Sequence, residues 1–236
     1  MDRGQNRAAQ RRRRPVRVPT TERPLHVKLE RYSRSARRLH TAVYLLTLFL
    51  LATGWWLLVG REGEPSPVAR LLGLPDAALH VWVGWGLAIA ALLPLVLARR
   101  GVAAFMRETL RRDPGDLGWL LRWPLAIVTG RFARHEGHFD PGQRIANVAI
   151  VGLLVALIAS GIGLVLVHFG PVFVVLAAVH RLATFAFTVV IAGHILVAAG
   201  ILPGYRGAWR SMHLGGRVRI DQRLKRRPGD REASSR

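Results

Sequence analysis

Two histidines lie within one apolar segment of the sequence, and histidine can bind a metal or carry a proton. His180 and His194 belong to residues 171–202, where Arg181 is the other ionisable residue. A helix of this length can cross a bilayer, because about 20 apolar residues suffice. Their spacing predicts that the two rings lie within about 40° of the same helix face, about 21 Å apart along the axis. Ionisable residues are costly inside a spanning helix, so these histidines indicate a functional site.

Two further histidines lie at the ends of other apolar segments. His40 precedes residues 42–60, and His80 stands near the start of residues 78–98. Residues 145–167 form another apolar segment without charged residues. The expected fold is therefore all-α, an integral membrane bundle of four helices at 42–60, 78–98, 145–167 and 171–202.

The segments between and before these spans carry weaker signals. We expect a short loop at 61–77, because it contains three prolines, and a small amphipathic piece at 103–110. Residues 117–129 are apolar but short, and Arg122 and Pro124 interrupt them, so we expect them to lie in the membrane interface. The pattern of 27–38 favours a helix that leads directly into the first span.

Composition and charge also favour a membrane protein. Half of the 236 residues are hydrophobic, yet the formal net charge is +21, a combination that a soluble domain rarely shows. Cysteine is absent, which excludes disulfides, iron–sulfur ligation and c-type haem attachment within this chain. The basic tails at 1–36 and 219–236 flank the membrane domain at 37–218. We expect the first tail to be disordered and its run Arg11–Arg14 to contact anionic lipid, not nucleic acid.

The distribution of basic residues predicts how the spans are oriented. Of the 35 lysines and arginines, all but Arg61, Arg70 and Arg181 lie before His40, in residues 99–144 or after residue 202. Because basic loops remain on the cytoplasmic side, both termini and the middle loop are expected in the cytoplasm of a bacterial cell, at its inner membrane.

This orientation sorts the histidines by depth into two pairs. His40 and His194 form an inner pair, and His80 and His180 form an outer pair. Two facing imidazoles are what a six-coordinate b-type haem requires, and its propionates require cations at the interface. Arg37 and Arg38 suit an inner haem, and Arg181 suits an outer one. Several glycines could let a flat macrocycle approach a helix, or could merely pack helices together: Gly54, Gly84, Gly86, Gly161 and Gly163.

At these residues the chain resembles a known family, the gamma or cytochrome b subunits of respiratory formate dehydrogenases. These subunits belong to a wider group with the b-type subunits of nickel–iron hydrogenases and thiosulfate reductases. The likeness spans about residues 37–218. It is carried by RLHTAVYLLTLFLLATG, LHVWVGWG, DLGWLL, GHFDPGQRIANV, VHRLATFAFTVVIAGH and YRGAWRSMHLGGRV.

The resemblance implies a membrane anchor with two b-type haems that passes electrons from an iron–sulfur partner to quinone. The implied ligands are His40, His80, His180 and His194. The implied complex also contains a catalytic molybdenum or tungsten subunit, and this chain is not itself the catalytic subunit. The implied quinone site lies beside the inner haem and its ligand His194. There Gln143 matches the family's glutamine, and Asp140 stands where asparagine is usual.

Several readings remain open from the sequence. Asp140 could bind and protonate the quinone, or it could cap the third span. His135 and His138 could form a metal pair with Glu136, although solvated loop residues are the simpler interpretation. His168 could bind a propionate or be an interface histidine, and His26 and His213 carry no usable signal. The alternative function is a haem-free membrane transporter or assembly anchor whose histidines relay protons or pack.

Overall fold

The computed structural model describes residues 27–30, 33–60, 64–205, 208–213 and 217–220. The described residues fall into two compact units, the first formed by 27–29 with 218–220 and the second by Glu30–Arg217. The first tail, with its expected disorder and the run Arg11–Arg14, lies outside the described residues, except for its last few positions.

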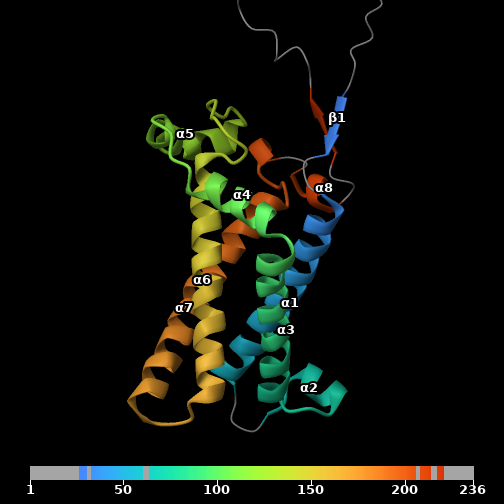
Figure 1. The fold of residues 1–236 in the computed structure, drawn as a ribbon, viewed down its shortest axis with the longest axis vertical. Helices are drawn as coiled ribbons and strands as arrows, with labels where there is room; N and C mark the ends of the chain where they lie inside the picture. Colours follow the sequence, from blue (N-terminus) through green and yellow to red (C-terminus); the bar gives the residue numbers. More distant parts are fainter. Residues whose placement is uncertain (1–26, 31–32, 61–63, 206–207, 214–216, 221–236) are drawn as a thin grey trace, which may run out of the picture. The chain divides into compact units, whose positions relative to one another are not determined.

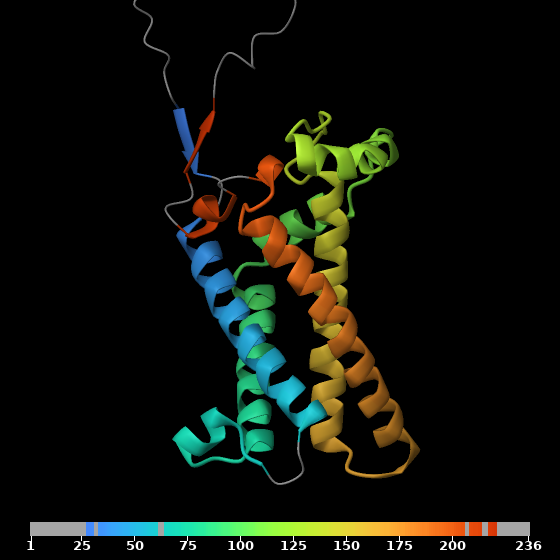
Figure 2. The same cartoon turned by 180° about the vertical axis from the view of Figure 1, so that it is seen from behind.

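Four long helices form the second unit, and each is long and apolar enough to cross a membrane. They are α1 (Arg34–Val59), α3 (Asp76–Leu97), α6 (Pro141–Leu166) and α7 (Gly170–Ala198). Consecutive helices run in opposite directions (Figures 1 and 2). The chain therefore contains the expected all-α bundle of four membrane helices.

The bundle consists of two helical hairpins. Helix α1 packs mainly on α3, and α6 packs mainly on α7, while α3 also touches α6 and α1 touches α7. Large apolar side chains cover the outside: Trp82, Val96 and Leu97 are each more than 70 % exposed. An apolar exterior is what a bundle in lipid requires, because the surrounding hydrocarbon cannot solvate polar groups. Three small polar residues, Thr47, Thr53 and Ser160, are instead buried.

The spans differ from their expected bounds mainly at their ends. Helix α1 begins at Arg34, because Ser33 caps it by accepting a hydrogen bond from the Ala36 amide. Helix α6 begins at Pro141 behind the cap residue Asp140. Helix α7 ends at Ala198, four residues before the expected limit. Apolar composition locates a span, but capping residues decide where its helix starts.

Five short helices lie at the ends of the bundle. Helix α2 (Pro67–Leu72) lies at one end, which we call the α2 end; α4 (Arg99–Leu110), α5 (Asp116–Thr129), η1 (Pro203–Tyr205) and α8 (Ala208–His213) lie at the other, the α5 end (Figure 1). The expected loop at 61–77 thus contains a helix, which Ser66 caps at one end and Gly73 ends in the left-handed conformation. Residues 117–129 do form a short helix, α5, which is too short to count among the spans.

One expectation was wrong at the start of the described chain. Residues 27–30, expected to be helical, form strand β1 (Val27–Glu30), which pairs with β2 (Arg217–Ile220). The helical pattern was misleading because a strand in a two-stranded sheet depends on its partner, which lies far away in the sequence.

Candidate functional site

The outer histidines lie together near the α2 end of the bundle. His80 comes from α3 and His180 from α7, and their ring centroids are 6.3 Å apart. Both side chains are half-buried. Each belongs to the second helix of its hairpin.

Each outer histidine contacts a hydroxyl group from the first helix of its hairpin. Nδ1 of His80 lies 2.9 Å from Thr53 Oγ1, and Nδ1 of His180 lies 2.9 Å from Ser160 Oγ. With Nδ1 engaged, Nε2 is the ring nitrogen left to bind a metal.

A cavity of about 420 Å³ surrounds the outer pair. His80, His180 and Arg181 line it together with Gly54, Gly84 and Gly161, and apolar side chains such as Leu50 and Phe187 form most of the remaining wall. A Cβ atom at Gly84 would meet nothing within 4 Å, which leaves open space beside the helix. The cavity therefore suits a large apolar group with a few polar contacts.

The inner histidines lie together at the α5 end. His40 from α1 and His194 from α7 have ring centroids 6.4 Å apart. Nδ1 of His40 is buried and has no hydrogen-bond partner among the described residues. The structure therefore brings together the same two pairs of histidines that the depth argument proposed.

The spacing of both pairs suits one metal ion between two rings. An imidazole nitrogen lies about 2 Å from a metal that it ligates and about 1 Å from its own ring centre, so two opposed ligands have centroids about 6 Å apart. Within the described part of the chain, no three histidines, aspartates or glutamates gather closely enough to hold a metal ion. A metal held at either pair must therefore bring further ligands with it, as the four nitrogens of a porphyrin would.

The arginines expected near the cofactors differ in their surroundings. Arg37 is half-buried, and its Nε has no hydrogen-bond partner within the described residues. Arg38 is exposed. Arg181 is exposed to the outside, yet it lines the outer cavity next to His180. Arg37 and Arg181 are therefore free to meet an anionic group at the inner and outer sites respectively.

The candidate glycines named from the sequence differ in their surroundings. Cβ atoms at Gly54 and Gly161 would lie 3.2 Å and 3.3 Å from the Cε1 atoms of His80 and His180. Both glycines thus let a histidine ring lie against the neighbouring helix. Gly163 instead brings Leu176 against α6, and Gly86 faces Leu46, so these two pack helices together.

Asp140 and Gln143 lie at the α5 end, where α6 begins. Asp140 caps the helix, because its Oδ1 accepts a 2.8 Å hydrogen bond from the Gln143 amide. Both side chains are half-buried. Nearby, burial raises the pKa of the Tyr205 phenol, a hydrogen bond from Trp123 opposes that shift, and the charge of Asp140 adds to it. The capping role is thus present, and it leaves the second carboxylate oxygen for another contact.

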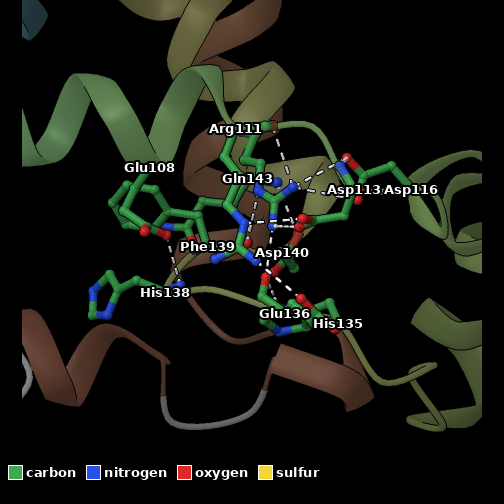
Figure 3. A network of polar contacts seen from close by, with 11 residues as sticks. Glu108, Arg111, Asp113, Asp116, His135, Glu136, His138, Phe139, Asp140 and Gln143 are labelled. Atoms are coloured by element: carbon green, nitrogen blue, oxygen red, sulfur yellow. Dashed lines mark hydrogen bonds and ion pairs between the residues drawn. The ribbon is translucent and has the colours of Figure 1, made fainter.

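Arg144, one turn into α6, is a site residue that sequence reasoning missed. Its side chain is 4 % exposed. Figure 3 shows the residues around this buried guanidinium, which donates to the carboxylates of Asp113 and Asp116 at 2.9 Å and 3.0 Å. It also donates to the backbone carbonyls of three residues, which are Arg111, Glu136 and Phe139. All five N–H groups of an arginine are thereby used.

These contacts hold the segment that leads to Asp140. They join the link between α4 and α5 to residues 136–139, and His138 adds a 2.8 Å bond from its amide to Glu108 (Figure 3). A single arginine before an apolar span gives no sign in the sequence that it is buried. Only its position directly after the GHFDPGQ stretch could have suggested that it belongs to the site.

Four other histidines gave only weak signals in the sequence. His213 of α8 lies 6.3 Å from His40 and 5.7 Å from Tyr44, between ring centroids, so it belongs to the surroundings of the inner pair. His135 and His138 are exposed, and no metal-binding group forms there among the described side chains. His168 is exposed beyond the end of α6.

Comparison with known proteins gives one family. The family model described as prokaryotic cytochrome b561 matches residues 31–215, which is most of the chain. No curated protein matches the sequence. The matched residues include both histidine pairs, the outer cavity and the Arg144 cluster.

Proposed function

The chain belongs to the prokaryotic cytochrome b561 family, and we propose that it binds two b-type haems, one at each histidine pair. Membership in the family makes it a membrane electron-transfer protein of the b-type cytochrome group with haem b as cofactor. The proposed ligands are His40 with His194 for an inner haem and His80 with His180 for an outer haem.

The observation that carries this proposal is the separation of the two pairs. Ring centroids 6.3 Å and 6.4 Å apart match two opposed imidazoles on one ion, and the match occurs twice. The outer cavity and its glycines support the same conclusion. A haem-free relay protein would have no need for two separate pairs with the same spacing.

Haem bound at these pairs supplies one-electron transfer, and the protein residues decide its surroundings. His80 and His180 present Nε2 from opposite helices, with Nδ1 held by hydroxyls. Apolar side chains form most of the wall of the outer cavity. Arg181 and Arg37 would pair with the carboxylates of the outer and inner haems.

We further propose that the chain serves an oxidoreductase complex of the formate dehydrogenase kind. An iron–sulfur subunit, itself supplied by a molybdenum or tungsten subunit, would deliver electrons at the outer haem, and quinone would receive them near the inner one. Asp140, Gln143 and His194 form the proposed quinone site, because Asp140 and Gln143 begin α6 at the same end of the bundle as the inner pair. Asp140 would take up protons from water and pass them to the reduced quinone, and Gln143 would donate a hydrogen bond to a quinone carbonyl.

A visible spectrum of the purified full chain tests this proposal. We expect a b-type spectrum after reduction and two haems per chain by pyridine haemochrome assay. A folded, monodisperse protein without haem, purified from haem-replete cells, would overturn the assignment. One haem per chain would overturn the claim that both pairs bind haem.

A further inference from the structure

Two buried hydroxyl groups have the same surroundings in the two hairpins. Thr53 in α1 and Ser160 in α6 are 4 % and 2 % exposed. Each lies 2.9 Å from Nδ1 of the outer histidine in the following long helix. Two equivalent contacts in different hairpins indicate a requirement of the site and not an accident of packing.

Each hydroxyl also donates its proton to its own helix. Thr53 Oγ1 donates to the Phe49 carbonyl at 3.0 Å, and Ser160 Oγ donates to the Ala156 carbonyl at 2.6 Å. A hydroxyl has one proton to give. With that proton given to a carbonyl, the bond to the histidine uses the proton on Nδ1. The contacts with Thr53 and Ser160 thus hold both outer histidines in the tautomer that leaves Nε2 with a free lone pair.

The glycines that follow the hydroxyl residues complete the arrangement. Gly54 and Gly161 let the ring edges lie against α1 and α6, where any larger residue would meet Cε1. In the sequence the unit reads Ala-Thr-Gly at 52–54 and Ala-Ser-Gly at 159–161. The inner pair differs, because Nδ1 of His40 has no partner within the described chain.

We propose that Thr53 and Ser160 are positioning residues that fix the tautomer of the outer ligands and lower the reduction potential of the outer haem. This inference rests on the proposed function. A hydrogen bond from Nδ1 makes the imidazole a stronger donor to iron, and a stronger donor favours the ferric state. Removing the hydroxyl should therefore raise the midpoint potential.

Thr53→Val tests the proposal, because valine keeps the shape and removes the hydroxyl. In the purified full chain we expect the outer haem to show a higher midpoint and an altered low-spin electron paramagnetic resonance signal. The inner haem should be unchanged. A tenfold loss of preference for the ferric state would appear as a shift of about 59 mV. Ser160→Ala should act in the same direction, because Ser160 makes the equivalent contact with His180.

The chain offers a matched control in Thr188→Val. Thr188 also donates to the carbonyl four residues earlier and accepts from a ring N–H of another helix, but that ring belongs to Trp55. Thr188→Val should therefore leave the midpoint potentials of both haems unchanged. Thr53→Ser, which restores the hydroxyl, should restore the original midpoint and signal of the outer haem.

The outcomes separate this inference from the proposed function. An unchanged outer midpoint and signal in Thr53→Val, with both haems bound, would overturn the positioning role and leave the haem assignment intact. Loss of the outer haem in both Thr53→Val and Thr53→Ser would also overturn it, because serine keeps the acceptor. Absence of haem from the unmodified chain would instead remove the proposed function.

Discussion

At the scale of single residues, the chemistry of each histidine depends on which ring nitrogen is free. For His80 and His180 the answer lies in Thr53 and Ser160, which engage Nδ1. For His40 the same nitrogen is buried without a partner among the described residues, and His213 and Tyr44 lie close by. The surroundings of the two histidine pairs therefore differ, although their ring centroids are almost equally far apart.

Replacing single histidines should remove the haems one at a time. His80→Ala should lower the haem content from two per chain to one and spare the inner haem, because its partner His180 belongs to the outer site. His40→Ala should spare the outer haem instead. Haem content and redox titration measure both effects, and exposed His168→Ala is the control that should keep two haems. If His40→Ala and His180→Ala removed the same haem, the pairing would be wrong.

Asp140→Asn separates the capping role of this residue from proton transfer. Asparagine caps a helix about as well as aspartate does, but it cannot carry a proton. We expect both haems to remain while quinone-linked turnover by the assembled complex falls about 100-fold or more, the usual range for loss of acid–base catalysis. Equal turnover at every pH, together with unchanged inhibitor affinity in Gln143→Ala, would remove quinone from this stretch.

At the scale of elements, the Arg144 cluster decides where α6 begins. The guanidinium joins the link between α4 and α5 to residues 136–139 through charged and backbone acceptors (Figure 3). Helix α5 is held at its first residue by the pair of Asp116 with Arg144, and further along Trp123 donates to the Tyr205 hydroxyl of η1 at 2.9 Å. Polar contacts therefore stabilise the α5 end, whereas helices with apolar, lipid-facing surfaces form the rest of the bundle.

Arg144→Met should weaken the polar contacts that hold the segment before α6. Removing one partner from a buried ion pair typically costs about 3 kcal/mol or more, because the remaining charges lose their compensation. We expect a lower thermal unfolding midpoint and faster proteolysis between residues 131 and 140, with both haems still bound. Arg122→Met is the matched control, because Arg122 is exposed on α5 and should change neither quantity. Equal proteolysis of the two variants would show that the cluster does not hold the segment.

The stability of the Arg144 cluster should depend on pH. Burial alone would raise the pKa of Asp113, but hydrogen bonds from Arg111 and Arg144 and their charges lower it. A carboxyl with a lowered pKa stabilises the fold fully above its unfolded value of about 3.9, and this stabilisation is lost as the pH falls through the folded value. Protection of residues 131–140 from proteolysis by an acid-active protease should therefore hold down to about pH 4 and fall below it. Arg144→Met should show a smaller change over that range.

At the scale of the whole molecule, the two histidine pairs lie at different depths of one bundle. Helix α7 contributes one histidine to each pair, and the fourteen residues from His180 to His194 separate these two by about 21 Å along the axis. This arrangement suits electron transfer from one side of a membrane to the other. Its direction in the cell depends on which side the α5 end faces.

The distribution of arginine predicts that the α5 end faces the cytoplasm. Reporter fusions after Gly130 and at the C-terminus should therefore give a cytoplasmic signal. A fusion between residues 63 and 67, in the link before α2, should report the outside, because that link lies at the opposite end of the bundle. A cytoplasmic signal from this link would reverse the orientation and with it the inner and outer labels of the haem sites.

The sequence by itself determined the number of spanning helices and the b-type cytochrome group, and it singled out the four histidines that we pair. A spanning helix is recognised when one apolar segment is long enough to cross the bilayer. This is a local property, so the spans could be located without knowledge of their neighbours. Helix ends and the small helix α2 were less predictable, because they depend on single capping residues such as Ser33 and Ser66. Strand β1 could not be recognised without its partner β2.

The tertiary structure alone decided how the site residues meet. It placed Thr53 and Ser160 against the outer histidines, buried Arg144 among carboxylates and carbonyls, and brought His213 beside His40. Each contact joins side chains from different helices or segments. Their approach depends on how the helices pack and rotate against one another, which the apolar pattern of a membrane helix leaves undetermined because nearly all of its faces are apolar.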